Sequence, residues 1–182
     1  MSTTTEIIQA VPAGTWALDG VHSSIGFEVA YLGGSFRGHF GDVDATLASA
    51  GNEARITGSA RVASVQVKDE NLETHLQSPD FFDAERQPEL RFESTDVRRS
   101  GDEITVRGDI TIKGVTRPVE LTGSISGPIT DGYARERIGL RLETVIDRTE
   151  FGVSWNMPLP TGEPALADEV NLVSDLYFVK EA

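Results

Sequence analysis

Residues 24–31 read SIGFEVAY, a stretch in which apolar side chains alternate with polar or small ones. Ile25, Phe27, Val29 and Tyr31 fall on one face of an extended chain, and the residues between them fall on the other. Alternation with a period of two predicts a β-strand that buries one face. Similar patterns recur at residues 36–47, 56–67, 90–92, 104–112, 119–125, 138–146 and 170–178. The sequence therefore predicts an all-β protein.

Two of the expected strands change phase partway along their length. The apolar parity shifts near Gly41 and Asp42 in the first strand and near Ala63 in the second. Extra residues of this kind are typical of β-bulges, which bend a strand and help a sheet to curl. Because about eight long strands follow one another, we predict a closed eight-stranded antiparallel barrel. A β-sandwich is the alternative.

One segment departs from the strand pattern. Residues 69–77 read DENLETHLQ and place Leu72, His75 and Leu76 at helical spacing. Asp69 is a suitable N-cap, and the acidic residues after it favour the positive end of a helix dipole. We predict a short helix here, inserted between two strands near one end of the barrel.

The loop after this helix contains two adjacent aromatic residues, Phe81 and Phe82, within SPDFFD at residues 78–83. An insertion of roughly twenty residues is long for a compact domain, and such loops often serve as lids or binding segments. We expect the two rings to close one end of the barrel. They act either as a plug alone or as a plug that also gates a ligand cavity.

Composition limits the class of protein. Of the 182 residues, 38% are hydrophobic and 25% are charged, which is typical of a globular protein. The net charge of −13 opposes binding to nucleic acid or to anionic lipid surfaces, because the protein repels phosphate groups. The absence of cysteine excludes disulfides and thiolate chemistry. No apolar run approaches the length of a membrane span, so we expect no stable membrane insertion.

The chain is expected to form one domain over residues 14–182, preceded by a flexible segment over residues 1–13. This amino-terminal segment has neither a basic region nor an apolar core of the kind found in secretory signals. The prediction is a cytoplasmic protein.

The sequence lacks the common signatures of catalytic and metal sites. His22, His39 and His75 do not have the short spacing of metal ligands. Neither a nucleophile elbow nor a glycine-rich phosphate loop is present. The carboxylates at residues 80–85 are more typical of a solvated loop or of helix caps than of an acid–base pair. We therefore expect no catalytic residues, no metal and no cofactor.

Five blocks of the sequence resemble the YceI-like family in their order and spacing. They are LDGVHSSIGFEVAYL at 18–32, SFRGHFGDVDATL at 35–47, NLETHLQSPDFFDAERQPELRFEST at 71–95, GDITIKGVTRPVEL at 108–121 and RTEFGVSW at 148–155. The resemblance implies a lipocalin-like barrel that binds a polyisoprenoid, such as an isoprenoid quinone or a polyprenyl phosphate, for sequestration or transport without catalysis. It also implies a homodimer.

The resemblance and the strand pattern together suggest which residues contact the lipid. The apolar set shares the inward face of the strands or lies in the aromatic loop: Phe27, Val29, Tyr31, Phe81, Phe82, Phe92, Val106, Ile110, Leu121, Leu140, Leu142, Leu172, Leu176 and Phe178. The family motifs also fall on four polar residues, for which we expect a structural role first and contact with the lipid head group or mouth second: His22, Ser23, Asp80 and Arg148.

Two departures from the family pattern bear on these expectations. Tyr31 stands where many members have a histidine, so this position keeps a ring and one polar tip but not an imidazole. Well-known members act in the bacterial periplasm, whereas no export signal is recognisable in this chain.

Two alternatives to a lipid carrier remain. The first is a stress-response or interaction module with a filled or vestigial cavity, whose partner surface would include Val173, Tyr177 and Val179 on the outward face of the last strand. The second is an enzyme acting on an isoprenoid, which requires a polar constellation inside the cavity.

Overall fold

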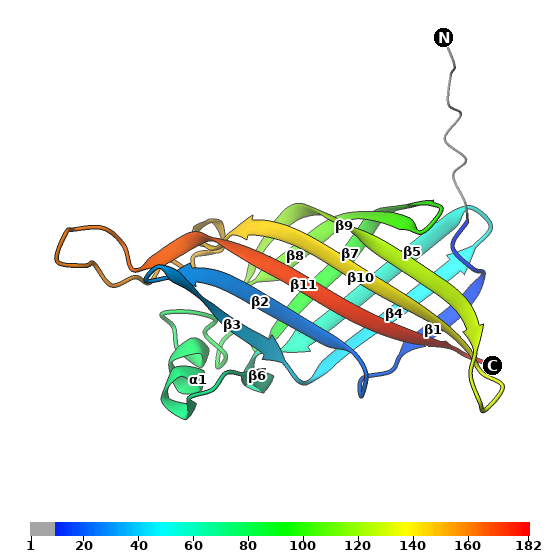
Figure 1. Ribbon diagram of the computed structural model, residues 1–182, viewed down its shortest axis with the longest axis horizontal. Coiled ribbons are helices and arrows are strands. Elements are labelled where there is room, and N and C mark those ends of the chain that lie inside the picture. The colour runs from blue at the N-terminus through cyan, green and yellow to red at the C-terminus, as the bar shows by residue number, and fades with distance from the viewer. Residues whose placement is uncertain (1–9) are drawn as a thin grey trace, which may run out of the picture.

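The computed structural model describes residues 10–182 and consists of strands, one α-helix and two short 3-10 helices (Figure 1). The elements in chain order are β1 (Gly14–Leu18), β2 (Ser24–Tyr31), β3 (Gly34–Phe40), β4 (Val43–Ala50), β5 (Glu53–Arg61), η1 (Val62–Ser64), β6 (Val65–Gln66), α1 (Glu70–Gln77), β7 (Glu89–Ser100), β8 (Glu103–Ile112), β9 (Val115–Thr130), β10 (Glu136–Asp147), η2 (Arg148–Phe151) and β11 (Leu166–Lys180).

The strands form one closed antiparallel barrel. β11 pairs with β2 along most of its length and with β1 near its end, where Trp16 lies opposite Lys180. β4 pairs with β1 and β5, while β3 pairs with β2 and β6. The pairs β1/β2, β3/β4 and β5/β6 therefore each act as one interrupted strand, and the ring has eight strands, each beside its neighbour in sequence. The predicted eight-stranded barrel is confirmed, and the sandwich alternative is wrong.

The phase changes coincide with the interruptions. Gly41 and Asp42 separate β3 from β4, as the shift in parity indicated. The second shift, near Ala63, is a turn of 3-10 helix, η1, in place of a simple bulge. The first interruption separates β3 from β4, and the second separates β5 from β6. Both β3 and β6 are short strands beside α1 at one end of the barrel (Figure 1).

Helix α1 forms where the spacing predicted it. The side chain of Asp69 accepts a hydrogen bond from the Leu72 amide at 3.0 Å, which makes Asp69 the N-cap. Glu70 and Glu73 lie in the first turn, where carboxylates favour the helix dipole. Leu76 is buried, so the helix is anchored to the barrel by its apolar side.

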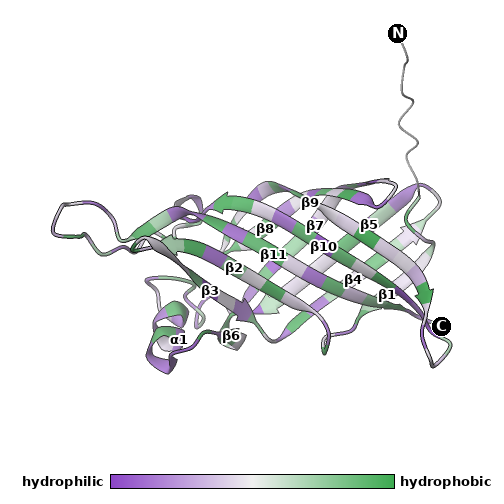
Figure 2. Ribbon diagram, viewed as in Figure 1, coloured by the Kyte–Doolittle hydropathy of each residue, from purple (hydrophilic) through white to green (hydrophobic). Residues whose placement is uncertain are grey.

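The buried apolar residues form two clusters, one toward each end of the barrel. The strands alternate between apolar and polar residues along their length, as expected for walls with one inward face (Figure 2). The first cluster lies at the end nearest the carboxyl terminus and includes Trp16, Val106, Ile125 and Phe178, none more than 1% exposed. The second cluster lies at the end near α1 and includes Phe40, Leu76, Phe81 and Phe151.

The first cluster is covered by part of the segment expected to be flexible. Val11 is 6% exposed, and its carbonyl accepts a hydrogen bond from the Ser49 hydroxyl at 2.9 Å. The indole of Trp16 donates to the Pro12 carbonyl at 3.1 Å. Val11 and Pro12 are thus packed against the barrel, and Val11 supplies apolar area at its filled end. The rest of the expected flexible segment lies outside the described residues.

Candidate functional site

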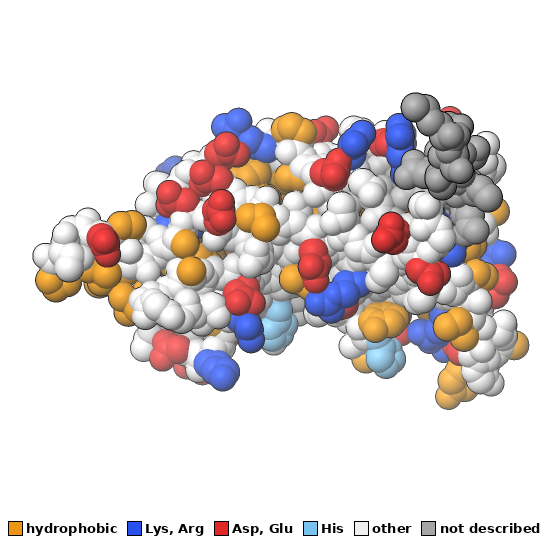
Figure 3. Space-filling view, turned by 45° about the horizontal axis from the view of Figure 1, so that its top comes forward, with side chains coloured by type: hydrophobic (Ala, Val, Ile, Leu, Met, Phe, Trp, Pro, Cys, Tyr) orange, Lys and Arg blue, Asp and Glu red, His pale blue; other side chains and the backbone are white. Residues whose placement is uncertain are grey.

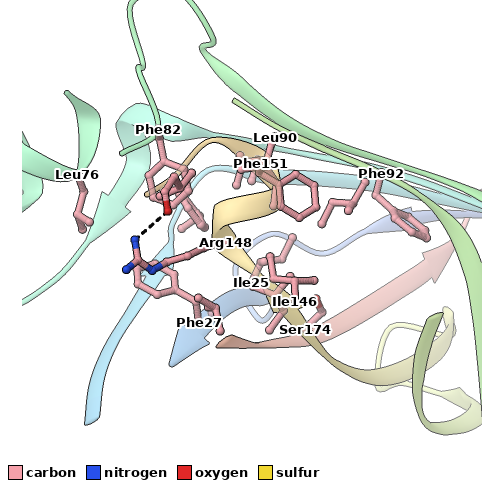
Figure 4. Close-up of a pocket in the computed structure, with 18 of the residues that line it drawn as sticks. Ile25, Phe27, Leu76, Phe82, Leu90, Phe92, Ile146, Arg148, Phe151 and Ser174 are labelled. Carbon is pink, nitrogen blue, oxygen red and sulfur yellow. Dashed lines mark hydrogen bonds between the residues drawn. The ribbon is translucent and has the colours of Figure 1, made fainter. Parts of the chain in front are cut away.

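A cavity of about 330 Å³ occupies the barrel end nearest α1 (Figure 4). This volume lies in the range of pockets that hold small ligands. The walls come from all sides of the barrel and from the helical insertion, which supplies Leu72, His75, Leu76, Phe81 and Phe82. Most of the lining side chains are aliphatic or aromatic, so the cavity suits an apolar ligand.

The floor of the cavity is formed where the two apolar clusters meet. Its residues line the cavity and also pack against the first cluster: Ile25, Ala45, Ile56, Phe92, Leu121, Leu142 and Leu176. In Figure 4, Phe92 lies at the side of the cavity remote from Phe82 and Arg148. Beyond this floor the barrel is filled by side chains.

Three residues expected to contact the lipid are placed beyond the floor. Val106, Leu140 and Phe178 point inward, but they belong to the filled cluster and do not line the cavity. The cavity does not reach these three residues, and their contact with a lipid stays a prediction. The side chains of these residues point into the barrel, as predicted. At this end, however, the side chains of facing strands are large enough to contact one another and fill the interior.

The other apolar residues expected at the site do line the cavity. They are Phe27, Val29, Tyr31, Phe81, Phe82, Phe92, Ile110, Leu121, Leu142, Leu172 and Leu176. Tyr31 is 43% exposed, which places its ring at the rim. Contact of these residues with a bound lipid stays a prediction.

The two adjacent phenylalanines have different neighbours. Phe81 is buried, with its ring 4.9 Å from the His75 ring and 5.4 Å from the Trp155 ring. Phe82 packs edge-on against Phe40 at 5.6 Å and against Phe27 at 6.4 Å between ring centroids. Phe81 therefore anchors the insertion to the barrel, whereas Phe82 reaches the rings of the cavity wall.

Arg148 is the one charged side chain that is buried among the described residues, and it lines the cavity. Its guanidinium donates to the carbonyls of Ala167 and Val153 at 2.8 Å each and to that of Trp155 at 2.9 Å. Removal from water lowers its pKa, and the carboxylate of Asp168, 3.8 Å away and largely exposed, offsets this only in part. Arg148 thus holds the segment between η2 and β11 against the barrel.

The remaining polar residues expected near the head group lie elsewhere. His22 pairs with Asp19 at 2.7 Å in the turn between β1 and β2, with its side chain 66% exposed. The Ser23 hydroxyl in the same turn accepts from the Tyr177 amide at 2.9 Å. Neither residue lines the cavity, because this turn lies along the barrel wall and not at its open end. Both residues therefore have the structural contacts expected first for them, and contact with a head group stays a prediction.

Asp80 is also outside the cavity lining, so its contact with a head group stays a prediction. Its carboxylate lies 3.0 Å from Nε2 of His75, which does line the cavity. His75 and Trp155 are therefore cavity residues that sequence reasoning missed. Their signals were present, since His75 has helical spacing with Leu72 and Leu76 and Trp155 ends the RTEFGVSW block.

Charged residues are spread over the outside of the barrel, often with opposite charges side by side (Figure 3). Examples are the cross-strand pairs Arg37–Glu28 and Arg107–Glu120, each at 2.8 Å. Exposed pairs of this kind contribute little to stability. Within residues 10–182 there is no cluster of histidine and carboxylate side chains that could hold a metal ion. No helix in the same range is long and apolar enough to span a bilayer.

The closed antiparallel barrel with an apolar cavity at one end has a lipocalin-like architecture. The model of the YceI-like domain matches residues 16–178, and the chain belongs to this family. Protein YceI of Escherichia coli O157:H7 is 30% identical over 169 residues, covering 90% of this chain and 84% of that protein. The UPF0312 protein of Photorhabdus laumondii is 33% identical over 140 residues, covering 74% of this chain and 72% of that protein.

Solved structures show the same fold. BcnA of Burkholderia cenocepacia matches with a TM-score of 0.76 at 21% identity, covering 88% of this chain and 98% of that one. A structure described as a polyisoprenoid binding domain from Saccharophagus degradans matches with a TM-score of 0.70 at 12% identity, covering 91% and 98% respectively.

Proposed function

We propose that this protein binds an isoprenoid lipid in the cavity and sequesters or carries it without catalysing a reaction. The observation that carries the proposal is the apolar cavity at the open end of the barrel. The family membership and the description of the Saccharophagus degradans domain as polyisoprenoid binding support a lipid as the ligand. The expected ligand is an isoprenoid quinone or a polyprenyl phosphate.

The physical basis is removal of the lipid tail from water. Burial of apolar surface stabilises a complex by about 25 cal/mol per Å², so each 100 Å² of buried tail contributes about 2.5 kcal/mol before the cost of ordering the tail. Such binding requires no cationic surface. This agrees with the net charge of −13, which does not favour adsorption on anionic lipid.

The polar groups on the cavity lining favour a binding role. Arg148 uses its hydrogen-bond donors on backbone carbonyls, and His75 is paired with Asp80. Tyr31 and His75 are polar residues of the cavity lining, and Tyr31 is at the rim, so we place the lipid head group at this end and its tail toward Phe92. Ser174 adds one hydroxyl to the lining.

The second candidate function is an interaction module. One end of the barrel is filled as this alternative requires, and Tyr177 on the outer face of β11 is 47% exposed. Val173 and Val179 share that face but are partly buried. A homodimer through this surface, and a cytoplasmic location, are further proposals.

The test is native mass spectrometry of freshly purified protein, followed by organic extraction of whatever is bound. We expect an adduct of one lipid per chain whose fragments differ by isoprene units. A protein that is free of lipid and stays free after incubation with quinones and polyprenyl phosphates contradicts the carrier proposal. That result favours the interaction module, which analytical ultracentrifugation then tests.

A further inference from the structure

We propose that the ring of Phe92 is the end stop of the cavity and limits the protein to lipids with short tails. This inference rests on the proposed function and names the class of ligand within it. It follows from the division of the barrel into a hollow end and a filled end, with Phe92 between them.

The ring of Phe92 is held at the boundary by its neighbours. A Cβ atom added at Gly108 of β8 would lie 2.4 Å from the Glu93 carbonyl oxygen and 2.7 Å from Cζ of Phe92, so the ring packs against the backbone of Gly108. Any other residue at position 108 would place a side chain in the space that the ring occupies. The missing side chain of Gly108 therefore lets Phe92 lie across the inside of the barrel.

Beyond Phe92 the barrel offers no continuation for a tail. Val106, one inward position past Gly108 on β8, is fully buried, and Leu140 and Phe178 are at most 3% exposed. Trp16, 1% exposed, is packed in the same cluster. A tail that enters at the α1 end cannot pass through to the other end.

The usable depth follows from strand geometry. Ile25 lies at the floor and Tyr31 at the rim, and six residues of a strand span about 20 Å. Because barrel strands tilt by about 35–45°, the depth along the barrel axis is about 15 Å. A long polyprenyl chain must fold back or protrude, whereas a short prenyl chain is enclosed.

The residue beside Phe92 on the neighbouring strand offers a way to make the cavity shallower. Gly58 of β5 is the register partner of Phe92 and lines the cavity. A Cβ atom added there approaches no atom closer than the Asp44 carbonyl oxygen at 3.4 Å. The backbone therefore accommodates the Cβ atom of a larger residue here, and because Gly58 lines the cavity beside Phe92, we expect a leucine side chain to occupy cavity space.

The experiment offers delipidated protein an equimolar mixture of geraniol, farnesol, geranylgeraniol and solanesol and measures the bound fraction of each by native mass spectrometry. The variants are Phe92→Ala, which makes the cavity deeper, and Gly58→Leu, which makes it shallower. Leu140→Ala is the matched control, since it opens a void in the filled end without lining the cavity.

We expect the unmodified protein to bind solanesol least of the four alcohols. The ratio of bound geranylgeraniol to farnesol should rise about tenfold in Phe92→Ala, equivalent to about 1.4 kcal/mol, and fall in Gly58→Leu. Leu140→Ala should leave the ratio unchanged. Should Phe92→Ala fail to fold, Gly58→Leu alone still decides.

Two outcomes overturn the inference in distinguishable ways. Unchanged ratios in both floor variants, or equal binding of solanesol by the unmodified protein, show that Phe92 is not an end stop although the protein binds isoprenoids. If the unmodified protein binds none of the four alcohols and no quinone or polyprenyl phosphate, the proposed function itself is wrong, and the end stop fails with it.

Discussion

Replacing Arg148 tests whether this buried cation is part of the scaffold or a binding group. Arg148→Met keeps most of the length of the side chain and removes all of its hydrogen-bond donors. Three carbonyls, those of Val153, Trp155 and Ala167, then lose a partner at 2.8–2.9 Å. The segment between η2 and β11 loses its main attachment to the barrel.

The magnitude follows from these contacts. Hydrogen bonds that involve a charged group contribute about 1.5–3 kcal/mol each, which gives an upper value of about 4.5–9 kcal/mol for three. Two effects make the actual loss smaller. The variant no longer has the desolvation cost of a buried charge, and water entering the cavity can hydrate some of the carbonyls. We therefore expect Arg148→Met to lower the free energy of unfolding by about 3–5 kcal/mol.

Urea denaturation measures this loss. With a slope of about 2 kcal/mol per molar urea, the midpoint should fall by about 2 M. The two tryptophans report on different regions, because Trp155 lies in the segment held by Arg148 and Trp16 lies in the filled end. Single-tryptophan variants show whether the mouth opens first.

Two further variants sharpen the result. Arg148→Lys keeps the charge but presents a compact ammonium, so it should recover only part of the stability. Arg117→Met is the matched control, because Arg117 donates to the Glu150 carbonyl from an exposed position and should change stability by less than about 0.5 kcal/mol. A loss below about 1 kcal/mol in Arg148→Met, with impaired lipid binding, would refute the structural role.

Two other predictions concern the aromatic loop and an acid-sensitive ion pair. Phe82→Ala should reduce retained lipid with little change in melting temperature, whereas Phe81→Ala should cost about 3 kcal/mol of stability because Phe81 is buried; unchanged lipid content in both variants supports a plain plug. The Arg137 guanidinium lowers the pKa of Asp19 to about 2 and also depresses the pKa of Asp131. Because both carboxyls have lowered pKa values in the folded protein, their stabilisation is present above the unfolded pKa of about 3.9 and is lost as the pH falls from there toward 2. Arg137→Gln should flatten the stability profile in this window, as measured by thermal unfolding, and an unchanged slope contradicts the assignment.

Much of the fold could be predicted from local patterns. The alternation in SIGFEVAY placed Phe27 and Val29 on the inward face because that pattern depends only on the pleat of the strand. The break at Gly41 and the cap at Asp69 were recognisable for the same reason, since parity and capping are properties of a few consecutive residues.

The site was predicted less completely because it depends on residues far apart in the chain. His22 belongs to a family motif, but its position along the barrel wall follows from where β1 and β2 join. The partners of Arg148 are backbone carbonyls of a loop. Because every residue has a backbone carbonyl, the sequence does not show which of them Arg148 contacts. The burial of Val11 was missed because a single valine before the first strand carries no periodicity.

The sequence by itself determined that the chain forms long alternating strands and that a short helix followed by two phenylalanines is inserted between them, and it favoured a barrel over a sandwich. Only the tertiary structure decided which part of the barrel is hollow. Phe92 and Phe178 have the same inward parity, yet one lines the cavity and the other is fully buried. The reason is that packing depends on the combined volume of side chains that meet across the barrel, and those residues come from strands widely separated in sequence.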